Sequence, residues 1–152
     1  METTLCILKK DNLILLGMKK SGFGNGKYNG IGGKIERMET PDEAMIRETQ
    51  EEISVTPIKY EKVGIIDFDE YYKGNKEHVI LHLYMVYQWN GNPKESDEMS
   101  PKWFNIKQVP FKQMLPDNKY WLPLILQGKK IKAHFNFDEN WNLLSKEIEY
   151  LN

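Results

Sequence analysis

The chain has 152 residues, of which 40% are hydrophobic and 28% charged, and its formal net charge is -1. This length predicts a single domain, residues 1–152, and the composition excludes a disordered or membrane-embedded chain. Because no overall positive charge exists, we expect a small anionic ligand as the partner rather than a nucleic-acid polymer.

The N-terminal segment METTLCILKK lacks the charged-then-apolar order of a signal peptide, and no apolar run reaches membrane-spanning length. Cys6 is the only cysteine, so an intramolecular disulfide cannot form, which is typical of a reducing compartment. We therefore expect a cytoplasmic protein with no membrane partner, and a monomer.

The first half of the chain predicts two strands, a loop and a helix. Residues 3–8 and 13–18 have strand character, with a tight turn at residues 11–12. Residues 21–33 (SGFGNGKYNGIGG) contain too much glycine for a helix and predict a long loop, with a strand end around residues 32–36.

The helix is predicted from Pro41 to about Ile53. Thr40 is a favourable N-cap, and Glu43 completes a capping box three residues later. At about 100° per residue, the inward face carries Ile46, Thr49 and Ile53, and the other face carries Glu48, Glu51 and Glu52.

The second half predicts strands at residues 63–68, 79–89 and 103–106, a helix at 119–127, and a hairpin of residues 131–137 and 141–150. Residues 79–89 carry apolar side chains on both faces, as a central strand does. The fold class is therefore α/β or α+β, a mixed β-sheet with helices packed on it.

The three glutamates of the predicted helix are spaced i, i+3 and i+4. Like charges at this spacing destabilise a helix by about 0.2–0.5 kcal/mol per pair, although Arg47 can pair with Glu51. A divalent cation would relieve the repulsion, and Mg²⁺ prefers oxygen ligands shared with substrate phosphates. The alternative is a solvated acidic face without a metal.

The complete segment from Gly33 to Glu52 decides between these alternatives. It reads GKIERMETPDEAMIRETQEE, which is G-x5-E-x7-R-E-x2-E-E. Six fixed residues match by chance with a frequency on the order of 10⁻⁷ per start position. The pattern favours magnesium-dependent chemistry on a phosphate chain, in which a carboxylate near an activated water acts as base.

These residues resemble the Nudix (MutT) hydrolase family, whose signature is G-x5-E-x7-R-E-U-x-E-E-x-G-U, where U is a bulky aliphatic residue. Thr49 replaces the first U and Ser54 replaces the late glycine. Glycine would adopt a left-handed conformation at the helix end at little cost, so Ser54 implies strain or a different exit. The resemblance implies an α/β/α sandwich that hydrolyses nucleoside diphosphates linked to another moiety.

The resemblance also implies which residues form the site. The divalent ions, Mg²⁺ with Mn²⁺ as a substitute, would be bound by the Gly32 carbonyl and by Glu48, Glu51, Glu52 and Glu98. Arg47 would orient these carboxylates. The catalytic base stays open between the helix glutamates and Glu98.

Residues 15–34 (LLGMKKSGFGNGKYNGIGGK) and the segments ESDEM and PDNKYWLPLILQGKK are similar to Nudix enzymes that hydrolyse oxidised purine nucleoside triphosphates. Those enzymes convert 8-oxo-dGTP to the monophosphate and pyrophosphate, and a nucleoside triphosphate is thus the expected partner. The implied substrate-binding residues are Thr4, Lys19, Phe23, Asn29, Gly33, Lys34, Leu115, Asp117 and Asn118.

Two of these positions differ from that group, which has tryptophan at the position of Leu115 and aspartate at the position of Asn118. The group has two adjacent aspartates where this chain has Asp117 and Asn118. Loss of an aromatic ring removes about 1–3 kcal/mol of base stacking, and an asparagine donates at any pH. We therefore hypothesise a shifted base preference or a weaker affinity. The alternatives are a Nudix hydrolase for another diphosphate and a nucleotide-binding module without turnover.

Overall fold

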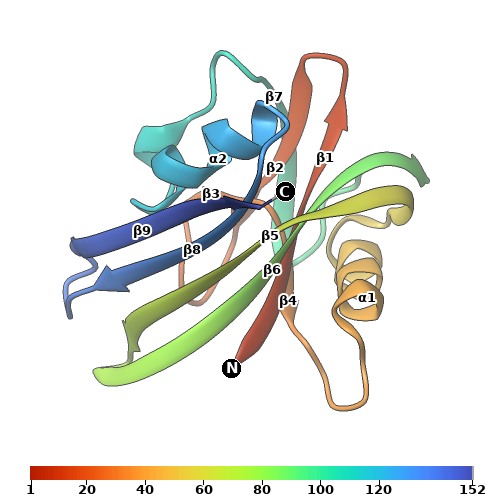
Figure 1. Ribbon diagram of the computed structural model, residues 1–152. Helices are drawn as coiled ribbons and strands as arrows, with labels where there is room; N and C mark the ends of the chain where they lie inside the picture. The colour runs from red at the N-terminus through yellow and green to blue at the C-terminus, as the bar shows by residue number, and fades with distance from the viewer. Residues whose placement is uncertain (152) are drawn as a thin grey trace.

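A computed structural model describes residues 1–151 and shows a mixed sheet with one helix on each side (Figure 1). The elements are β1 (Glu2–Lys10), β2 (Leu13–Lys19), β3 (Tyr28–Asn29), β4 (Ile31–Lys34), α1 (Pro41–Ile53), β5 (Thr56–Tyr72), β6 (Asn75–Asn90), β7 (Met99–Asn105), the 3-10 turn η1 (Phe111–Gln113), α2 (Asn118–Leu126), β8 (Lys130–Phe137) and β9 (Leu143–Leu151). Within this described part, neither helix has the length and apolar character needed to cross a membrane.

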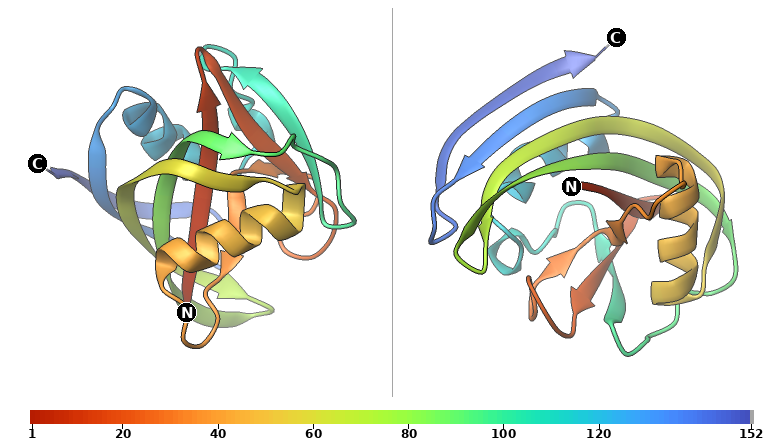
Figure 2. Two further views of the ribbon diagram at one scale, coloured as in Figure 1. Left: turned by 90° about the vertical axis from the view of Figure 1, so that its right-hand side faces the viewer. Right: turned by 90° about the horizontal axis from the view of Figure 1, so that it is seen from below.

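The nine strands form one sheet in the order β3-β2-β1-β6-β5-β8-β9, with β4 paired to β1 and β7 paired to β2. The β1–β6 and β5–β8 pairs are parallel and the others antiparallel. The β5–β6 hairpin is long and strongly curved (Figure 2). Register shifts between residues 57 and 64 of β5 allow this bend.

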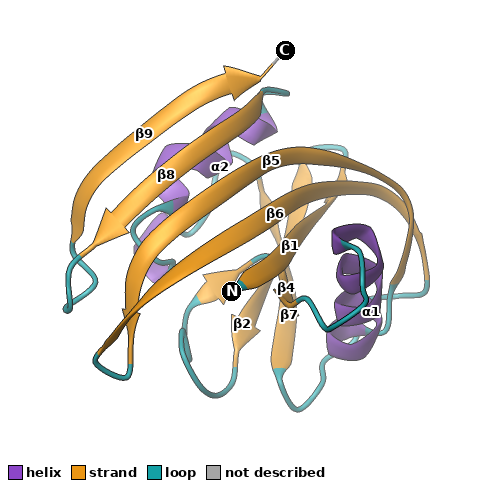
Figure 3. Ribbon diagram, turned by 60° about the horizontal axis from the view of Figure 1, so that its bottom comes forward, coloured by secondary structure: helices purple, strands orange, loops and turns teal. Residues whose placement is uncertain are grey.

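Strand β1 shows why the sheet has two covered faces. Its side chains alternate, so Leu5 and Ile7 join the core under α2, whereas Cys6 and Leu8 join the core under α1. Strands β2 and β6 divide their apolar side chains in the same way. The helices therefore lie on opposite sides of one sheet (Figure 3), which confirms the predicted sandwich.

The predicted elements are present, but several bounds differ. The glycine-rich segment is not all loop, because Tyr28–Asn29 and Ile31–Lys34 pair with β2 and β1. Strand β5 begins at Thr56 rather than residue 63, since its first half pairs with β6 at the bend. Strand β9 begins at Leu143, which leaves Trp141 in the turn after β8.

Candidate active site

Helix α1 begins as its sequence predicts. The Thr40 hydroxyl accepts from the Glu43 backbone N–H and the Glu43 carboxylate accepts from the Thr40 N–H, both at 3.1 Å, which completes the capping box. The helix ends at Ser54, whose φ of 61° is left-handed. This backbone conformation is the strain that serine introduces in place of glycine.

Two glycines of β4 lie where a side chain has no room. A Cβ atom on Gly33 would lie 2.7 Å from the Glu48 carboxyl group, and one on Gly32 would lie 1.9 Å from the Thr4 carbonyl oxygen. Neither distance is compatible with a side chain. Gly33 therefore lets the Glu48 carboxyl of α1 approach β4, whereas Gly32 lets β4 lie close to β1 at Thr4.

Arg47 connects the acidic residues of the site. Its Nε donates to Glu39 at 2.6 Å, and Nη1 donates to Glu48 at 3.0 Å and to Glu51 at 3.2 Å. Nη2 donates to the Lys34 carbonyl at 3.1 Å, which ties α1 to β4. Hydrogen bonding to Arg47 also holds the pKa of Glu39 below its ordinary value.

Glu52 does not lie on the exposed face with Glu51, and this corrects the predicted division of the helix. On a helical wheel Glu52 is about 60° from the buried Thr49, whereas Glu51 is about 160° away. Glu52 is accordingly only 7% exposed. Burial, followed by the charge of Glu48, a hydrogen bond with Glu48 and the charge of Glu98, raises the pKa of Glu52 to about 8.

The Glu52 carboxyl is suited to a cation. Its Oε2 is buried and has no hydrogen-bond partner within residues 1–151, and the Gly32 backbone lies within hydrogen-bonding reach of the carboxyl group. A buried oxygen without a partner and two converging carboxyls match the oxygen ligands that Mg²⁺ prefers. Within the same residues, however, no three His, Cys, Asp or Glu side chains already form a metal-holding group, and Glu48 and Glu51 both accept hydrogen bonds from Arg47.

A pocket of about 220 Å³ adjoins this site at Gly32 and Gly33. It brings together most of the predicted substrate residues, namely Thr4, Lys19, Phe23, Asn29, Gly33, Leu115, Asp117 and Asn118. Lys34 does not line it, and its backbone carbonyl is occupied by Arg47. The two glycines of β4 therefore line the same cavity as Leu115, Asp117 and Asn118.

Several buried polar atoms in this pocket lack partners. The Thr4 hydroxyl and the Asn118 Oδ1 have none within the described chain, although the two side chains are only 1% and 3% exposed. Asp117 accepts from the Trp121 indole N–H at 2.8 Å, and its burial raises its pKa to about 6. Unpaired buried polar atoms are costly, so a polar ligand in this pocket would be stabilised by hydrogen bonds to them.

The pocket also contains residues that the sequence did not single out. Its apolar wall includes Phe68, Val79, Leu81 and Trp121, and it is completed by Glu70 and Trp141. The alternation of β5 places Phe68 and Glu70 on one face, so this signal was available once the strand was known to continue. No local sequence pattern identifies Trp141 as a pocket residue, because only the position of the turn between β8 and β9 brings it to the pocket.

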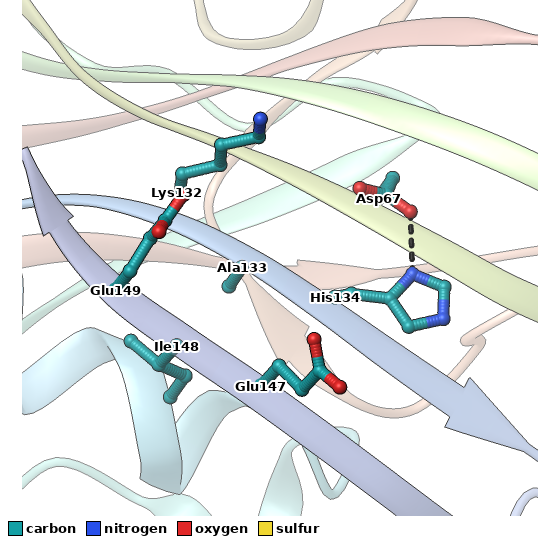
Figure 4. Close-up of a pocket in the computed structure, with 7 residues that line it drawn as sticks. All are labelled: Asp67, Lys132, Ala133, His134, Glu147, Ile148 and Glu149. Carbon is teal, nitrogen blue, oxygen red and sulfur yellow. Dashed lines mark hydrogen bonds and ion pairs between the residues drawn. The ribbon is translucent and has the colours of Figure 1, made fainter.

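A larger hollow, of about 570 Å³, lies on the open face of β5, β8 and β9 (Figure 4). No predicted site residue lines it. Its histidine is already paired, because His134 bonds to Asp67 through Nδ1 and contacts Asp69 at 3.2 Å through Nε2. This hollow is a solvated polar face and is not the candidate site.

Comparison with known proteins agrees with this geometry. The NUDIX domain family model matches residues 2–125. A protein of Mus musculus named oxidized purine nucleoside triphosphate hydrolase is 41% identical over 95% of this chain and 92% of its own length, and one of the same name from Danio rerio is 42% identical over 88% and 85%. The crystal structure of a MutT protein from Bacillus halodurans superimposes with a TM-score of 0.86 at 24% identity, covering 97% of each chain.

Proposed function

Because this chain belongs to the Nudix family, we propose that it is a pyrophosphohydrolase that acts on oxidised purine nucleoside triphosphates such as 8-oxo-dGTP. The products are the nucleoside monophosphate and pyrophosphate. The observation that carries the proposal is a base-sized pocket with unpaired polar atoms that reaches Gly32 and Gly33, the glycines beside the Glu48 and Glu52 carboxyls. The names of the two vertebrate relatives support the choice of base.

A divalent cation, Mg²⁺ with Mn²⁺ as a substitute, fits the residues present. Glu48, Glu52 and the Gly32 carbonyl would hold it, and Glu51 and Glu98 would join through rotation of their exposed side chains. When bound, such an ion polarises a phosphoryl oxygen and lowers the pKa of a water.

The protein groups orient the reactants and move the proton. Arg47 fixes the Glu48 carboxylate through a hydrogen bond of 3.0 Å. The Glu52 carboxyl, with its free Oε2, is the proposed acceptor of the proton that the attacking water loses, and Glu98 is the alternative base.

The pocket residues would position the nucleotide. The Lys19 ammonium is available to the phosphates at the pocket mouth. The Asn29 Oδ1 accepts from the Gly30 N–H at 2.9 Å, which leaves the amide N–H groups of Asn29 free to donate to the purine edge. Leu115 offers an aliphatic contact in place of an aromatic ring.

We also propose the domain organisation, the oligomeric state and the location of the protein. Residues 1–152 would act as one domain, because the two cores on either side of the sheet share strands β1, β2 and β6. A monomer in the cytoplasm would carry the activity, with no nucleic-acid polymer or membrane as partner.

A second candidate function is favoured by one observation. Leu115 gives the pocket no aromatic platform at that position, so a Nudix hydrolase for a different modified nucleotide is the alternative. A nucleotide-binding module without turnover fits less well, since the buried Glu52 would then have no role that offsets the cost of burying it.

The test is a panel of normal, oxidised and methylated purine nucleoside triphosphates, with pyrophosphate release measured in the presence of Mg²⁺ and after its removal by EDTA. We expect metal-dependent release, with the highest kcat/KM for an oxidised purine. A higher kcat/KM for a methylated or unmodified purine would support the alternative substrate. Binding without turnover for every nucleotide would support the silent module.

A further inference from the structure

The Glu70 side chain lies in the base pocket, although nothing in the Nudix pattern assigns it a role. It follows Phe68 by two positions on β5, and both side chains line the pocket. The intervening Asp69 points to the opposite face of the sheet, where it bonds to His78 at 3.0 Å. Glu70 is therefore separated from the ion pairs of the open face.

Glu70 lies away from the cluster that would meet the phosphates. Gly33 pairs with Thr4 across the sheet, Thr4 pairs with His82, and His82 pairs with Ile65. Glu70 lies further along β5 from Ile65, close enough to Asp117 for the two carboxyls to interact. Since a carboxylate repels phosphate oxygens, a group at this end of the pocket is placed to meet the base.

The end of the pocket near Glu70 is rich in hydrogen-bond acceptors. Asn118 has a free Oδ1, while its Nδ2 already donates to the Leu115 carbonyl at 3.1 Å. Burial, then the charges of Asp117 and Glu77, raises the pKa of Glu70 to about 7, so the carboxylate that acts only as an acceptor predominates above this pH. The pocket end thus complements a ligand that brings N–H donors.

Oxidation gives a guanine base an N–H donor that the unmodified base lacks. Unmodified guanine presents the acceptors N7 and O6 along one edge. Oxidation at C8 places a hydrogen on N7, so a lone pair becomes an N–H donor. A carboxylate accepts a hydrogen bond from this N–H and repels the lone pair of the unmodified base.

We propose that Glu70 is a specificity-determining residue whose carboxylate accepts a hydrogen bond from an N–H that the oxidised purine carries and the unmodified purine lacks. The inference rests on the proposed function and adds to it the group that distinguishes the two bases. Asp117 and Asn118 recognise the rest of the base edge.

The experiment measures binding rather than turnover, with 8-oxo-dGMP and dGMP as probes and calorimetry as readout, at about pH 8 where Glu70 is ionised. The variants are Glu70→Gln and Glu70→Leu. We expect the ratio of the two affinities to fall by about 10-fold or more in both variants, because a hydrogen bond to a charged acceptor is lost. In Glu70→Gln the affinity for dGMP should also rise, since an amide N–H can donate to N7.

Glu149→Gln is the matched control, because it removes the same charge from the exposed strand β9 and should leave the ratio unchanged. An unchanged ratio in both Glu70 variants overturns the inference. A parallel loss of affinity for both nucleotides also overturns it, since that result describes a structural role.

The proposed function fails separately, if wild-type protein hydrolyses oxidised purine triphosphates no better than other nucleotides. A wild-type protein that prefers them, together with an unchanged ratio in the Glu70 variants, removes only the role of Glu70.

Discussion

The rings of Phe23 and Trp141 are in contact, with their centroids 4.6 Å apart, and join the glycine-rich loop to the turn between β8 and β9. Trp141 is itself held by its indole N–H, which donates to the Tyr71 carbonyl at 3.2 Å, and by the ring of Phe137 at 4.7 Å. The loop around Phe23 is closed by backbone hydrogen bonds, from Asn25 to Gly22 at 3.1 Å and from Gly26 to Lys19 at 2.9 Å, and the Phe23 ring also meets that of Tyr72 edge-on at 6.4 Å. Trp141 is the nearer of the two aromatic contacts of Phe23 and helps to position this ring at the pocket.

Trp141→Ala should weaken nucleotide binding. An aromatic pair contributes about 0.5–1.5 kcal/mol beyond its buried area, so we expect Kd to rise about 2- to 10-fold. Trp141→Phe should restore most of the affinity, and Leu144→Ala, an exposed position on the same hairpin, should have no effect. Titration calorimetry with a non-hydrolysed nucleotide measures all three. Equal affinities for Trp141→Ala and wild type would show that the contact has no influence on the site.

Glu52 and Glu51 should differ in their effect on catalysis, because only Glu52 is buried with a free oxygen. Glu52→Gln keeps the shape but removes the charge, so we expect kcat to fall on the order of 10³-fold with an unchanged circular dichroism spectrum. Glu51→Gln should lose less, since this exposed carboxylate pairs with Arg47. Steady-state kinetics over a range of Mg²⁺ concentrations separates them. A Glu52→Gln protein that Mg²⁺ still stimulates fully would remove Glu52 from the central role.

Ser54→Gly should stabilise the protein. Ser54 is left-handed with a φ of 61°, a conformation that costs a residue with a Cβ about 1–2 kcal/mol. Glycine avoids this cost but loses more chain entropy on folding, so the net gain in free energy of unfolding should be about 0.5–1 kcal/mol. Urea denaturation measures it. Ser54→Ala retains the strain and should show no gain, and a gain of equal size in both variants would contradict the explanation.

Asp117 should make stability depend on pH. Burial raises its pKa in the folded protein to about 6 from an ordinary value of 3.8, so folding favours the protonated carboxyl. Its contribution to stability is fully present below about pH 4 and is lost as the pH rises through about 6. Asp117→Asn cannot ionise and keeps an acceptor for Trp121. The variant should therefore be more stable than wild type at about pH 8, by at most about 3 kcal/mol, and equal to it at about pH 4.

Urea denaturation of both proteins at the two pH values checks this expectation. A stability difference that is the same at both values would show that the Asp117 carboxyl does not titrate between them.

The elements that the sequence predicted well are those with local signals. Helix α1 begins with the capping box of Thr40 and Glu43, which depends on residues three positions apart. The strand β6 was recognisable because its apolar residues occupy both faces. The bend in β5 and the pairing of residues 28–34 could not be recognised from the sequence, because both depend on strands that are distant in the sequence.

The Nudix pattern could be recognised from the amino-acid sequence alone, because its glycine, arginine and glutamates lie within one strand-to-helix segment. Helix geometry sets the spacing of Arg47 and the three glutamates that follow it. Only the tertiary structure separated Glu52 from Glu51, since burial depends on what packs against α1. Only it brought Glu70 and Trp141 to residues 115–118, because β5, the β8–β9 turn and the start of α2 meet through the sheet and not through the chain. The catalytic pattern of the family was therefore readable locally, whereas the walls of the proposed base pocket are a property of the folded molecule.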